Sequence, residues 1–333
     1  LESCEDLHTA FEMGKTGNVN VSIHPFEDLK CDNFTTFSLS SGYDLDVLST
    51  ENLDNFHGGC MLENVRFEVT NGSKFVWETN AHFYYEELGD LPDVHGGAVY
   101  VEQGSVVRFL NDFETTNVGV RSQTVKDSDF SDHVNDGGCV WVGGYFRVDG
   151  DAVMTHCENS GGGESSPGRG GALFVESCGS VLFAQGVKIA DVSIIDDEGN
   201  NGGGIYNLGK VNVRGDSTFT DCFAESAGAI YNGADAVFQF KNDASAIFWN
   251  CRSFDGQAGA IMNFGEFKFD GPAVFLEGHS YDRASQIYVG DGAFVRIKKH
   301  SYFFGNTCDE ANCAPIYVAS GGEASVSDTT IFV

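Results

Sequence analysis

Short hydrophobic runs of four or five residues alternate with turns rich in Gly, Asn and Asp along most of the chain. In one such region, residues 228–232 are followed by Val237–Phe240 and then by Ala246–Trp249. Runs of β-branched and aromatic residues between turn residues predict β-strands, and the 3.6-residue periodicity of an amphipathic helix is missing here. The region therefore contains three short strands per repeat, which is what one coil of a parallel β-helix requires.

A four-residue phrase, small-small-aliphatic-aromatic, organises this strand pattern and occurs nine times at a mean spacing of about 32 residues. A supersecondary unit repeated at such a period is typical of a solenoid. The third position of the phrase is aliphatic in every copy: Met61, Val99, Val140, Leu173, Ile205, Ile230, Ile261, Ile287 and Ile316. Because the coils of a β-helix stack about 4.8 Å apart, we expect these side chains to form one continuous inward ladder.

Two residues after the aliphatic position, three successive copies carry Asn207, Asn232 and Asn263. A glycine follows each of them within two residues, which marks a turn. Equivalent asparagines in adjacent coils can hydrogen-bond to one another through their side-chain amides. The sequence therefore predicts an asparagine ladder that runs from coil to coil.

The fourth position of the phrase is aromatic in seven copies: Tyr100, Trp141, Phe174, Tyr206, Tyr231, Tyr288 and Tyr317. Successive side chains of a strand point to opposite faces, so these rings should face outward if the aliphatic position faces inward. An exposed aromatic column is a candidate surface for ligand binding or for assembly with another subunit. The alternative is that these rings fill the core.

The phrase also resembles the repeats of polymorphic outer-membrane proteins and related β-helix proteins of bacteria and algae. The residues that carry the resemblance are Gly96-Gly-Ala-Val99, Gly170-Gly-Ala-Leu173, Gly202-Gly-Gly-Ile205 and Phe303-Phe-Gly-Asn306. The similarity covers roughly residues 58–318 and implies a β-helical domain of the kind often used in adhesion. The cysteines and glycosylation motifs of this chain favour a secreted eukaryotic relative of the algal type. Such short motifs specify a fold better than a function.

The N-terminal segment predicts a helix over residues 5–13, with Leu7, Ala10 and Phe11 on one face and Gly14 at its end. A solenoid needs its open end covered, and this helix is suited to that role. Residues 20–24, 34–39 and 45–48 are the expected strands of the first coils. We therefore expect one all-β domain, a right-handed parallel β-helix in which residues 1–57 form the cap helix and first coils and residues 58–333 form the repeats.

The chain is strongly acidic, with 49 Asp and Glu against 19 Lys and Arg and a net charge of −30. Such a charge repels nucleic acid and anionic membrane surfaces, so nucleic-acid binding is excluded as a function class. No run of about 18 apolar residues is present, and we expect no membrane span.

Ten cysteines, without a Cys-x-x-Cys motif or zinc-ligand spacing, indicate an oxidising compartment and structural disulfides. Cys4 with Cys31 is an expected clamp, and Cys222 with Cys251 is an expected pair in adjacent coils, for which a ladder of free thiols is the alternative. Glycosylation sequons begin at Asn20, Asn33 and Asn71. These features predict a secreted glycoprotein that is extracellular or lies at the cell surface.

Longer acidic segments precede the phrase at residues 86–95, 122–136, 158–169 and 191–201. They should project from the same edge of successive coils, where their carboxylates form a hypothetical calcium site, with Asp129, Asp132, Asp136, Asp196 and Asp197 as ligands. No EF-hand or nonapeptide calcium repeat is present. Ordinary solvated loops are the alternative, and the fold requires no cofactor.

An enzyme must be weighed, because many parallel β-helices cleave or epimerise acidic polysaccharides. Arg169 beside Asp132, Asp136 and Asp197 is the arrangement that such chemistry would use. However, the basic residues are too few to line a groove for a polyanion, and no lyase or hydrolase motif is present. We therefore predict a non-catalytic extracellular subunit of a filament, wall or coat, with self-association, other extracellular proteins or glycans as partners. An adhesin or carbohydrate-binding module is the first alternative, and a polysaccharide lyase or epimerase is the second.

Overall fold

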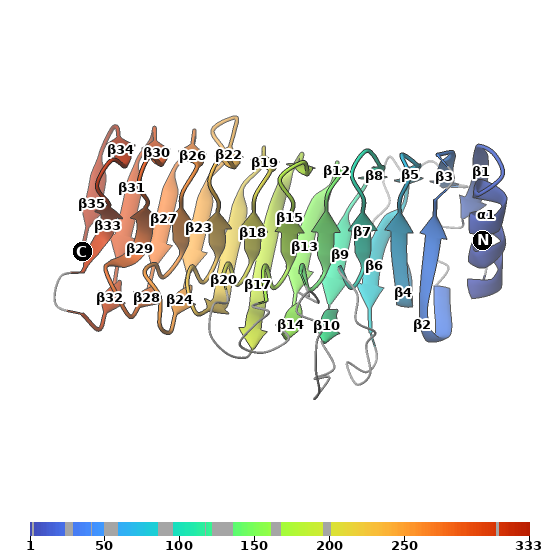
Figure 1. Cartoon of the computed structure of the whole chain (residues 1–333), viewed down its shortest axis with the longest axis horizontal. Coiled ribbons are helices and arrows are strands. Elements are labelled where there is room, and N and C mark those ends of the chain that lie inside the picture. The colour runs from blue at the N-terminus through green and yellow to red at the C-terminus, as the bar shows by residue number, and fades with distance from the viewer. Residues whose placement is uncertain are drawn as a thin grey trace, which may run out of the picture.

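The computed structural model is a parallel β-solenoid with one short N-terminal helix (Figure 1). It describes residues 1, 3–23, 29–40, 42–49, 59–85, 96–116, 118–121, 136–160, 168–195, 201–310 and 313–333. Every strand pairing is parallel, and each coil contributes three main strands. The all-β parallel β-helix expected from the repeat is confirmed.

Helix α1 (Cys4–Gly14) lies at the N-terminal end of the rod (Figure 1). The Ser3 hydroxyl caps it by accepting a hydrogen bond from the backbone N–H of Asp6 at 3.1 Å. Its buried face carries Leu7, Ala10 and Phe11, and the Phe11 ring packs 5.6 Å from the Phe75 ring of the first coils. The Cys4–Cys31 disulfide ties this helix to the adjacent strand. The expected capping helix and its clamp are both present.

One side of the rod is an 11-stranded sheet with one strand from each coil. Its strands, in spatial order, are β1 (Val19–Ile23), β3 (Asp44–Ser49), β5 (Lys74–Trp77), β8 (Val106–Phe109), β12 (Tyr145–Val148), β16 (Ser180–Phe183), β19 (Lys210–Val213), β22 (Val237–Phe240), β26 (Glu266–Phe269), β30 (Phe294–Ile297) and β34 (Glu323–Val326).

The remaining strands form a 24-stranded sheet, which contains two further series. The phrase series runs through β2 (Leu29–Leu39), β4 (Gly59–Val69), β7 (Val99–Val101), β11 (Val140–Val142), β15 (Leu173–Val175), β18 (Ile205–Asn207), β21 (Ile230–Asn232), β25 (Ile261–Asn263), β29 (Ala284–Val289) and β33 (Ala314–Val318). The lateral series runs through β6 (Asn80–Tyr84), β9 (Phe113–Thr116), β13 (Asp151–Thr155), β17 (Gly186–Ile195), β20 (Ser217–Ala224), β23 (Ala246–Trp249), β27 (Ala273–Leu276), β31 (Ser301–Phe304) and β35 (Thr330–Phe332). Short strands extend the lateral coils: β10 (Gly119–Arg121), β14 (Glu158–Ser160), β24 (Arg252–Ser253), β28 (His279–Ser280) and β32 (Thr307–Cys308).

The aliphatic position of the phrase points into the core, as expected, from Val99 to Ile287, and each of these side chains is fully buried. The first copy is an exception. Met61 pairs with His82 of the lateral series and is 37% exposed, whereas Phe67, later in the same strand β4, pairs with Val99. The prediction that Met61 joins the inward ladder is therefore wrong, because β4 is long enough to pair with both series.

The predicted asparagine ladder is present inside the coils. Asn207 Nδ2 donates to Asn232 Oδ1 at 2.7 Å, and Asn232 Nδ2 donates to Asn263 Oδ1 at 2.7 Å. All three side chains are fully buried. The Asn207 and Asn263 amide oxygens also accept the backbone N–H of the glycine two residues later, which fixes the turn into the next strand.

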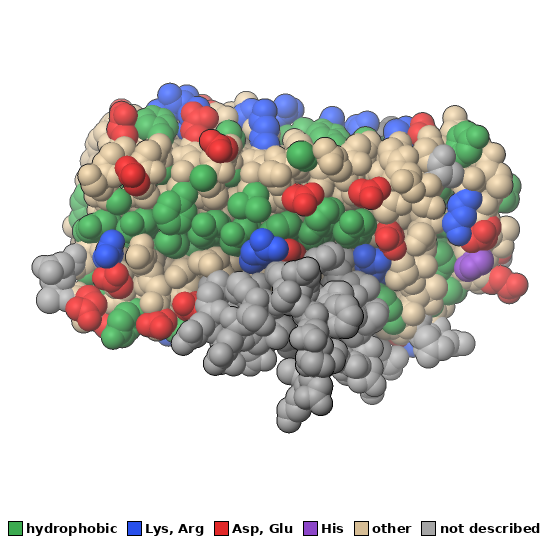
Figure 2. Space-filling model, viewed as in Figure 1, with side chains coloured by type: hydrophobic (Ala, Val, Ile, Leu, Met, Phe, Trp, Pro, Cys, Tyr) green, Lys and Arg blue, Asp and Glu red, His purple; other side chains and the backbone are tan. Residues whose placement is uncertain are grey.

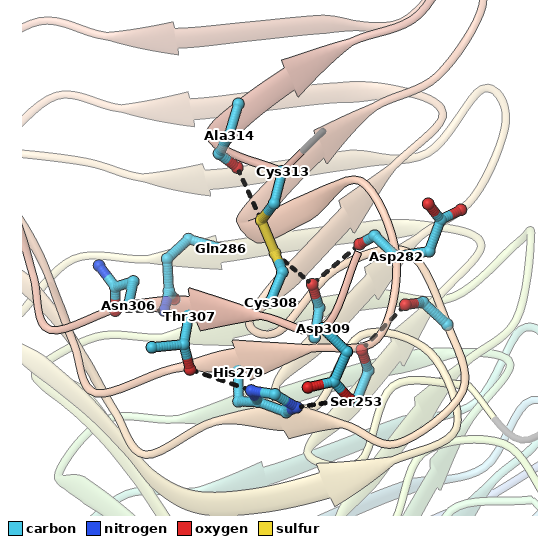
Figure 3. Close-up of a disulfide and its surroundings, with 12 residues drawn as sticks. Ser253, His279, Asp282, Gln286, Asn306, Thr307, Cys308, Asp309, Cys313 and Ala314 are labelled. Atoms are coloured by element: carbon cyan, nitrogen blue, oxygen red, sulfur yellow. Dashed lines mark hydrogen bonds and ion pairs between the residues drawn. A yellow bond between two sulfur atoms is a disulfide. The ribbon is translucent and has the colours of Figure 1, made fainter. Parts of the chain in front are cut away.

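Two more disulfides join Cys139 to Cys157 and Cys308 to Cys313. Figure 3 shows the second of these beside His279, whose imidazole lies 3.0 Å from the Thr307 hydroxyl. The expected Cys222–Cys251 disulfide is absent, and both residues are buried free thiols. Equivalent side chains of in-register parallel strands point in the same direction with Cβ atoms about 4.8 Å apart, which exceeds the spacing a disulfide prefers. The Sγ atoms instead contact backbone carbonyls, and burial raises the pKa of Cys222.

Candidate functional site: an outer aromatic ladder

The aromatic position of the phrase forms a ladder of stacked rings on the outside of the phrase series. The backbone register places Tyr100, Trp141, Phe174, Tyr206 and Tyr231 beside one another in consecutive coils. Ring centroids are 4.4 to 6.1 Å apart along this stretch, and the ring planes differ by 9 to 19°. Figure 2 shows a band of hydrophobic side chains along the long axis of this face, flanked by charged side chains.

The ladder continues towards the C-terminal coils, although one rung changes. Met262 occupies the phrase position after Tyr231, and the Phe264 ring fills the gap between Tyr231 and Tyr288. The Tyr288 and Tyr317 rings then stack 5.6 Å apart. The seven predicted residues are therefore brought together in one surface feature, which we call the outer ladder (Tyr100, Trp141, Phe174, Tyr206, Tyr231, Phe264, Tyr288 and Tyr317).

The outer ladder points away from the main core, as strand alternation predicts, but its rungs differ in exposure. Trp141, Phe174 and Tyr288 are buried, at 8%, 3% and 7% exposed, whereas Tyr100, Tyr206, Tyr231 and Tyr317 are half-buried. On β18, Ile205 and Asn207 are fully buried, whereas Tyr206 between them remains half-buried. The rings stack face to face, so they present mainly their edges to solvent. Sugar rings stack on exposed aromatic faces, and most of this ladder offers none. Its expected role in ligand binding or assembly stays a prediction.

Three arginines lie over the ladder, and the sequence pattern identified only Arg169. The Arg169 guanidinium is 4.9 Å from the Phe174 ring centroid and 5.6 Å from that of Tyr206. Arg66 lies over Tyr100, and Arg283 lies over Tyr317. Such cation–π contacts contribute about 0.5–1 kcal/mol each at exposed sites and more when water is excluded.

Arg169 is also held by a buried carboxylate. Its Nε and one terminal nitrogen donate to the two carboxylate oxygens of Asp136 at 2.7 and 2.6 Å, and Asp136 is only 3% exposed. Burial raises the pKa of Asp136 to about 6, although the Arg169 guanidinium acts in the opposite direction. The pair therefore locks the guanidinium in the plane that lies over the rings, and little of its charge is left for a ligand.

An open groove of about 680 Å³ lies at the N-terminal end of the outer ladder. It is lined by Asn71, Gly72, Tyr100, Glu102, Gln103, Trp141 and Glu176. Glu102 accepts the backbone N–H of Asn71 at 2.7 Å, and burial together with Glu102 and Glu68 raises the pKa of Tyr100. Aromatic edges beside carboxylate and amide groups are suited to a sugar with several hydroxyls. The sequence pattern identified Tyr100 and Trp141 but not the groove, because its walls come from four successive coils.

The hypothetical calcium ligands are not brought together by the described residues. Asp136 is paired with Arg169, while Asp129, Asp132, Asp196 and Asp197 lie outside the described part of the chain. Within that part, no group of three or more His, Cys, Asp and Glu side chains has the arrangement of a metal site. The calcium site stays a prediction.

Two of the three glycosylation sequons can be placed on the surface. Asn20 is exposed on β1, and Asn71 is exposed in the turn between β4 and β5. Asn33 lies on β2. Asn71 Nδ2 donates to the Ser40 carbonyl at 3.0 Å, and this residue also borders the groove.

Comparison with known proteins gives no match to a family model, to a curated protein or to a solved structure. The resemblance to polymorphic outer-membrane-protein repeats therefore rests on the repeat residues, while the β-solenoid itself is established. Among the described residues, no helix combines the length and apolar character needed to cross a bilayer.

Proposed function

We propose that this protein is an extracellular, non-catalytic β-helical subunit of a filament, wall or surface coat. The proposal rests on one observation: the polar and aromatic side chains that could serve a binding or catalytic site instead contact one another between coils. Asn232 bonds to both neighbouring coils, Arg169 is bound to Asp136, and the phrase aromatics stack on one another. A chain built in this way gains axial rigidity rather than a reactive centre.

The lyase alternative is weakened by the same contacts. It needs Arg169 available to neutralise a uronate and Asp136 available as a base. These two groups form a bidentate ion pair in which Asp136 is buried and the Arg169 side chain is 29% exposed. Incubation with alginate and pectin should therefore give no unsaturated product, and formation of such a product would contradict the non-catalytic proposal.

Sedimentation velocity and negative-stain microscopy of the purified protein, in calcium and then in chelator, test the assembly. We expect species larger than a monomer in at least one condition, and dissociation in chelator would assign part of the contact to the acidic loops. A monomer in both conditions at every concentration would contradict the proposal.

Glycan binding is the second candidate function, and the groove beside Tyr100 and Trp141 is the observation that favours it. A glycan array should then give signals that Tyr100→Ala and Glu176→Gln remove. Tyr317→Ala, at the opposite end of the outer ladder, is the matched control and should leave binding unchanged. An array without signals, or equal loss in all three variants, would count against this site.

A further inference from the structure

The outward side chains of the lateral series form two columns that change character along the rod. The register aligns the first column as Glu114, Val153, Lys188, Thr218, Ile247, Val274, Tyr302 and Ile331. The second column is Thr116, Thr155, Ala190, Thr220, Trp249, Leu276 and Phe304. Both are mainly polar up to β20, and both are apolar from β23 onwards. We call the six apolar residues of β23, β27 and β31 the lateral face.

The lateral face leaves large apolar side chains in contact with water. Trp249 is 48% exposed, Tyr302 is 42% exposed and Phe304 is 53% exposed, while Ile247 is 36% exposed. The orientation of the Trp249 side chain is fixed by a hydrogen bond of 3.0 Å that its Nε1 donates to the Glu277 carboxylate. Within the described part of the chain, the rings of Trp249, Tyr302 and Phe304 stack on no other ring, unlike those of the outer ladder. Contiguous apolar surface of this kind marks an interaction site.

Charge distribution points to what covers this face. Residues 1–200 carry 34 acidic and 10 basic side chains, a net charge of −24, whereas residues 201–333 carry 15 and 9, a net charge of −6. Two copies of a chain with a net charge of −30 repel each other over most of their length. The coils that bear the lateral face are the part where that repulsion is smallest. The sequons at Asn20, Asn33 and Asn71 also lie far from it in the sequence.

We propose that the lateral face binds the same face of a second copy in an antiparallel two-fold pair. This inference rests on the proposed function and names its contact. The face is an in-register parallel sheet, and two such sheets pack about 10 Å apart with interdigitating side chains. In the antiparallel arrangement the acidic coils of the two copies extend away from each other, and charges farther apart than about 8 Å are screened at physiological salt. A two-fold contact closes on itself, so this contact gives a dimer, and a filament or coat would need a further contact between dimers.

The chemistry of the lateral face favours a second copy over a sugar. A sugar site needs several convergent polar groups to satisfy hydroxyls. The lateral face presents aliphatic and aromatic side chains in adjacent columns, with the Glu277 carboxylate already bonded to Trp249. Its composition matches the aromatic-rich core of a protein interface.

Sedimentation velocity of the full chain tests the contact with the double variant Trp249→Ser, Phe304→Ser. The measurement uses a Cys178→Ser background, because Cys178 is an exposed free thiol that could link copies by a disulfide. We expect the dissociation constant of the dimer to rise at least about 10-fold in the double variant, since aromatic side chains dominate interface affinity. Val153→Ser, an apolar-to-serine change in the first column and in the polar half, is the control and should leave the dissociation constant unchanged. Circular dichroism melts check that all variants fold.

The outcomes separate the two proposals. Assembly that persists unchanged in the folded double variant overturns the lateral contact and leaves the structural function standing. A wild-type protein that is monomeric at every concentration overturns both. Dimerisation that weakens as salt is raised also contradicts an apolar contact, because salt should reduce the repulsion between acidic copies and strengthen it. Equal weakening by Val153→Ser would show that the contact is not confined to the lateral face.

Discussion

The N-terminal and C-terminal coils fill the same core with the same residue type in different geometries. Between Phe67 and Phe146 the rings are tilted or perpendicular, as for Phe109 and Phe146, whose planes differ by 61°. From β20 onwards the rings at equivalent positions of successive coils stack nearly parallel, and Phe248 lies 4.9 Å from Phe219 and from Phe275 with planes differing by 8° and 7°. Contacts between different columns stay perpendicular, as for Phe240 and Phe248, whose planes differ by 88°. Stacking therefore becomes regular in one half only.

The residues that face one another in adjacent coils explain this difference. From β20 onwards Phe219, Phe248, Phe275 and Phe303 occupy equivalent positions, so each ring stacks on the same residue type. In the earlier coils Phe109 is paired with Val148 and Phe146 with Val107, so the nearest rings come from different columns and meet at an angle. Coil length differs as well: the aliphatic phrase positions are 32 to 41 residues apart from Val99 to Ile205, and 25 to 31 residues apart from Ile205 to Ile316. The earlier half is therefore irregular both in repeat length and in its core columns.

The largest expected effect on stability comes from removing one phenylalanine ring from the core in each half of the rod. Phe248→Ala and Phe109→Ala both truncate fully buried rings, and such changes cost about 3–5 kcal/mol. We expect Phe248→Ala to lie at the upper end, because its stacked neighbours are held in register and cannot close the cavity. Phe109→Ala should lie at the lower end, since differently oriented rings can repack. Denaturant unfolding measures both, and a larger loss for Phe109→Ala would contradict this account.

The two halves also differ at the column that holds the asparagine ladder, which carries valine in the earlier coils and asparagine in three of the later ones. Asn207 follows Val142 and Val175 in the same column, so valine fits this position in the earlier coils. Asn232→Val alone should lower the free energy of unfolding by about 2 kcal/mol, because it leaves two amide groups without their partner. Replacing Asn207, Asn232 and Asn263 together by Val should cost less per residue, as the column becomes uniformly apolar. Thermal and urea unfolding test this, and strictly additive losses would contradict it.

The Asp136–Arg169 pair gives a pH dependence that belongs to the irregular half. The pKa of Asp136 is about 6 in the folded protein, whereas the ordinary value for an aspartate is 3.8. The folded state therefore binds the carboxyl proton more tightly than the unfolded state does. Its contribution to stability is fully present below pH 3.8 and is lost as the pH rises through 6. Relative to Asp136→Asn, the wild type should therefore gain about 1–3 kcal/mol between pH 7 and pH 4. Parallel unfolding curves for the two proteins across this range would contradict the shift.

The smallest expected effect is at the other end of the outer ladder. Arg283 lies over Tyr317 with a 44% exposed side chain, and its carboxylate partner Asp282 is also accessible to water. Arg283→Ala should reduce stability by only about 0.5 kcal/mol. Arg169→Ala is the comparison, and it should cost several times more because it leaves a buried carboxylate without its partner. Equal losses in the two variants would contradict the importance of burial.

The sequence predicted those features that repeat once per coil. The aliphatic ladder, the asparagine ladder and the stacked phrase aromatics all follow from residues that recur at equivalent positions, so the period itself gives their register. The capping helix followed from a local pattern around Leu7 and Phe11. The same logic failed at Met61, where a phrase-like segment lies at the start of a strand that pairs with two series.

Features that depend on exact side-chain geometry or on several coils were not predictable. Cys222 and Cys251 occupy equivalent positions as expected, but the parallel direction of their side chains prevents a bond that sequence position alone suggested. Arg66 and Arg283 approach the ladder from turns whose path no repeat specifies. The hydrophobicity of Trp249 and Phe304 suggested strands, yet only the register shows that they point outward.

Helix α1 gives the rod a direction. It lies across the core at the N-terminal end, with Phe11 packed among the first phenylalanines and Cys31 bonded to Cys4. A second rod meeting this end would encounter a helix in place of a free strand edge, so β-strand pairing cannot add a coil there. If copies associate, the N-terminal end can therefore contribute contacts through helix α1 but no strand pairing. The two ends of the rod are thus chemically different, and association by strand pairing could not join two N-terminal ends.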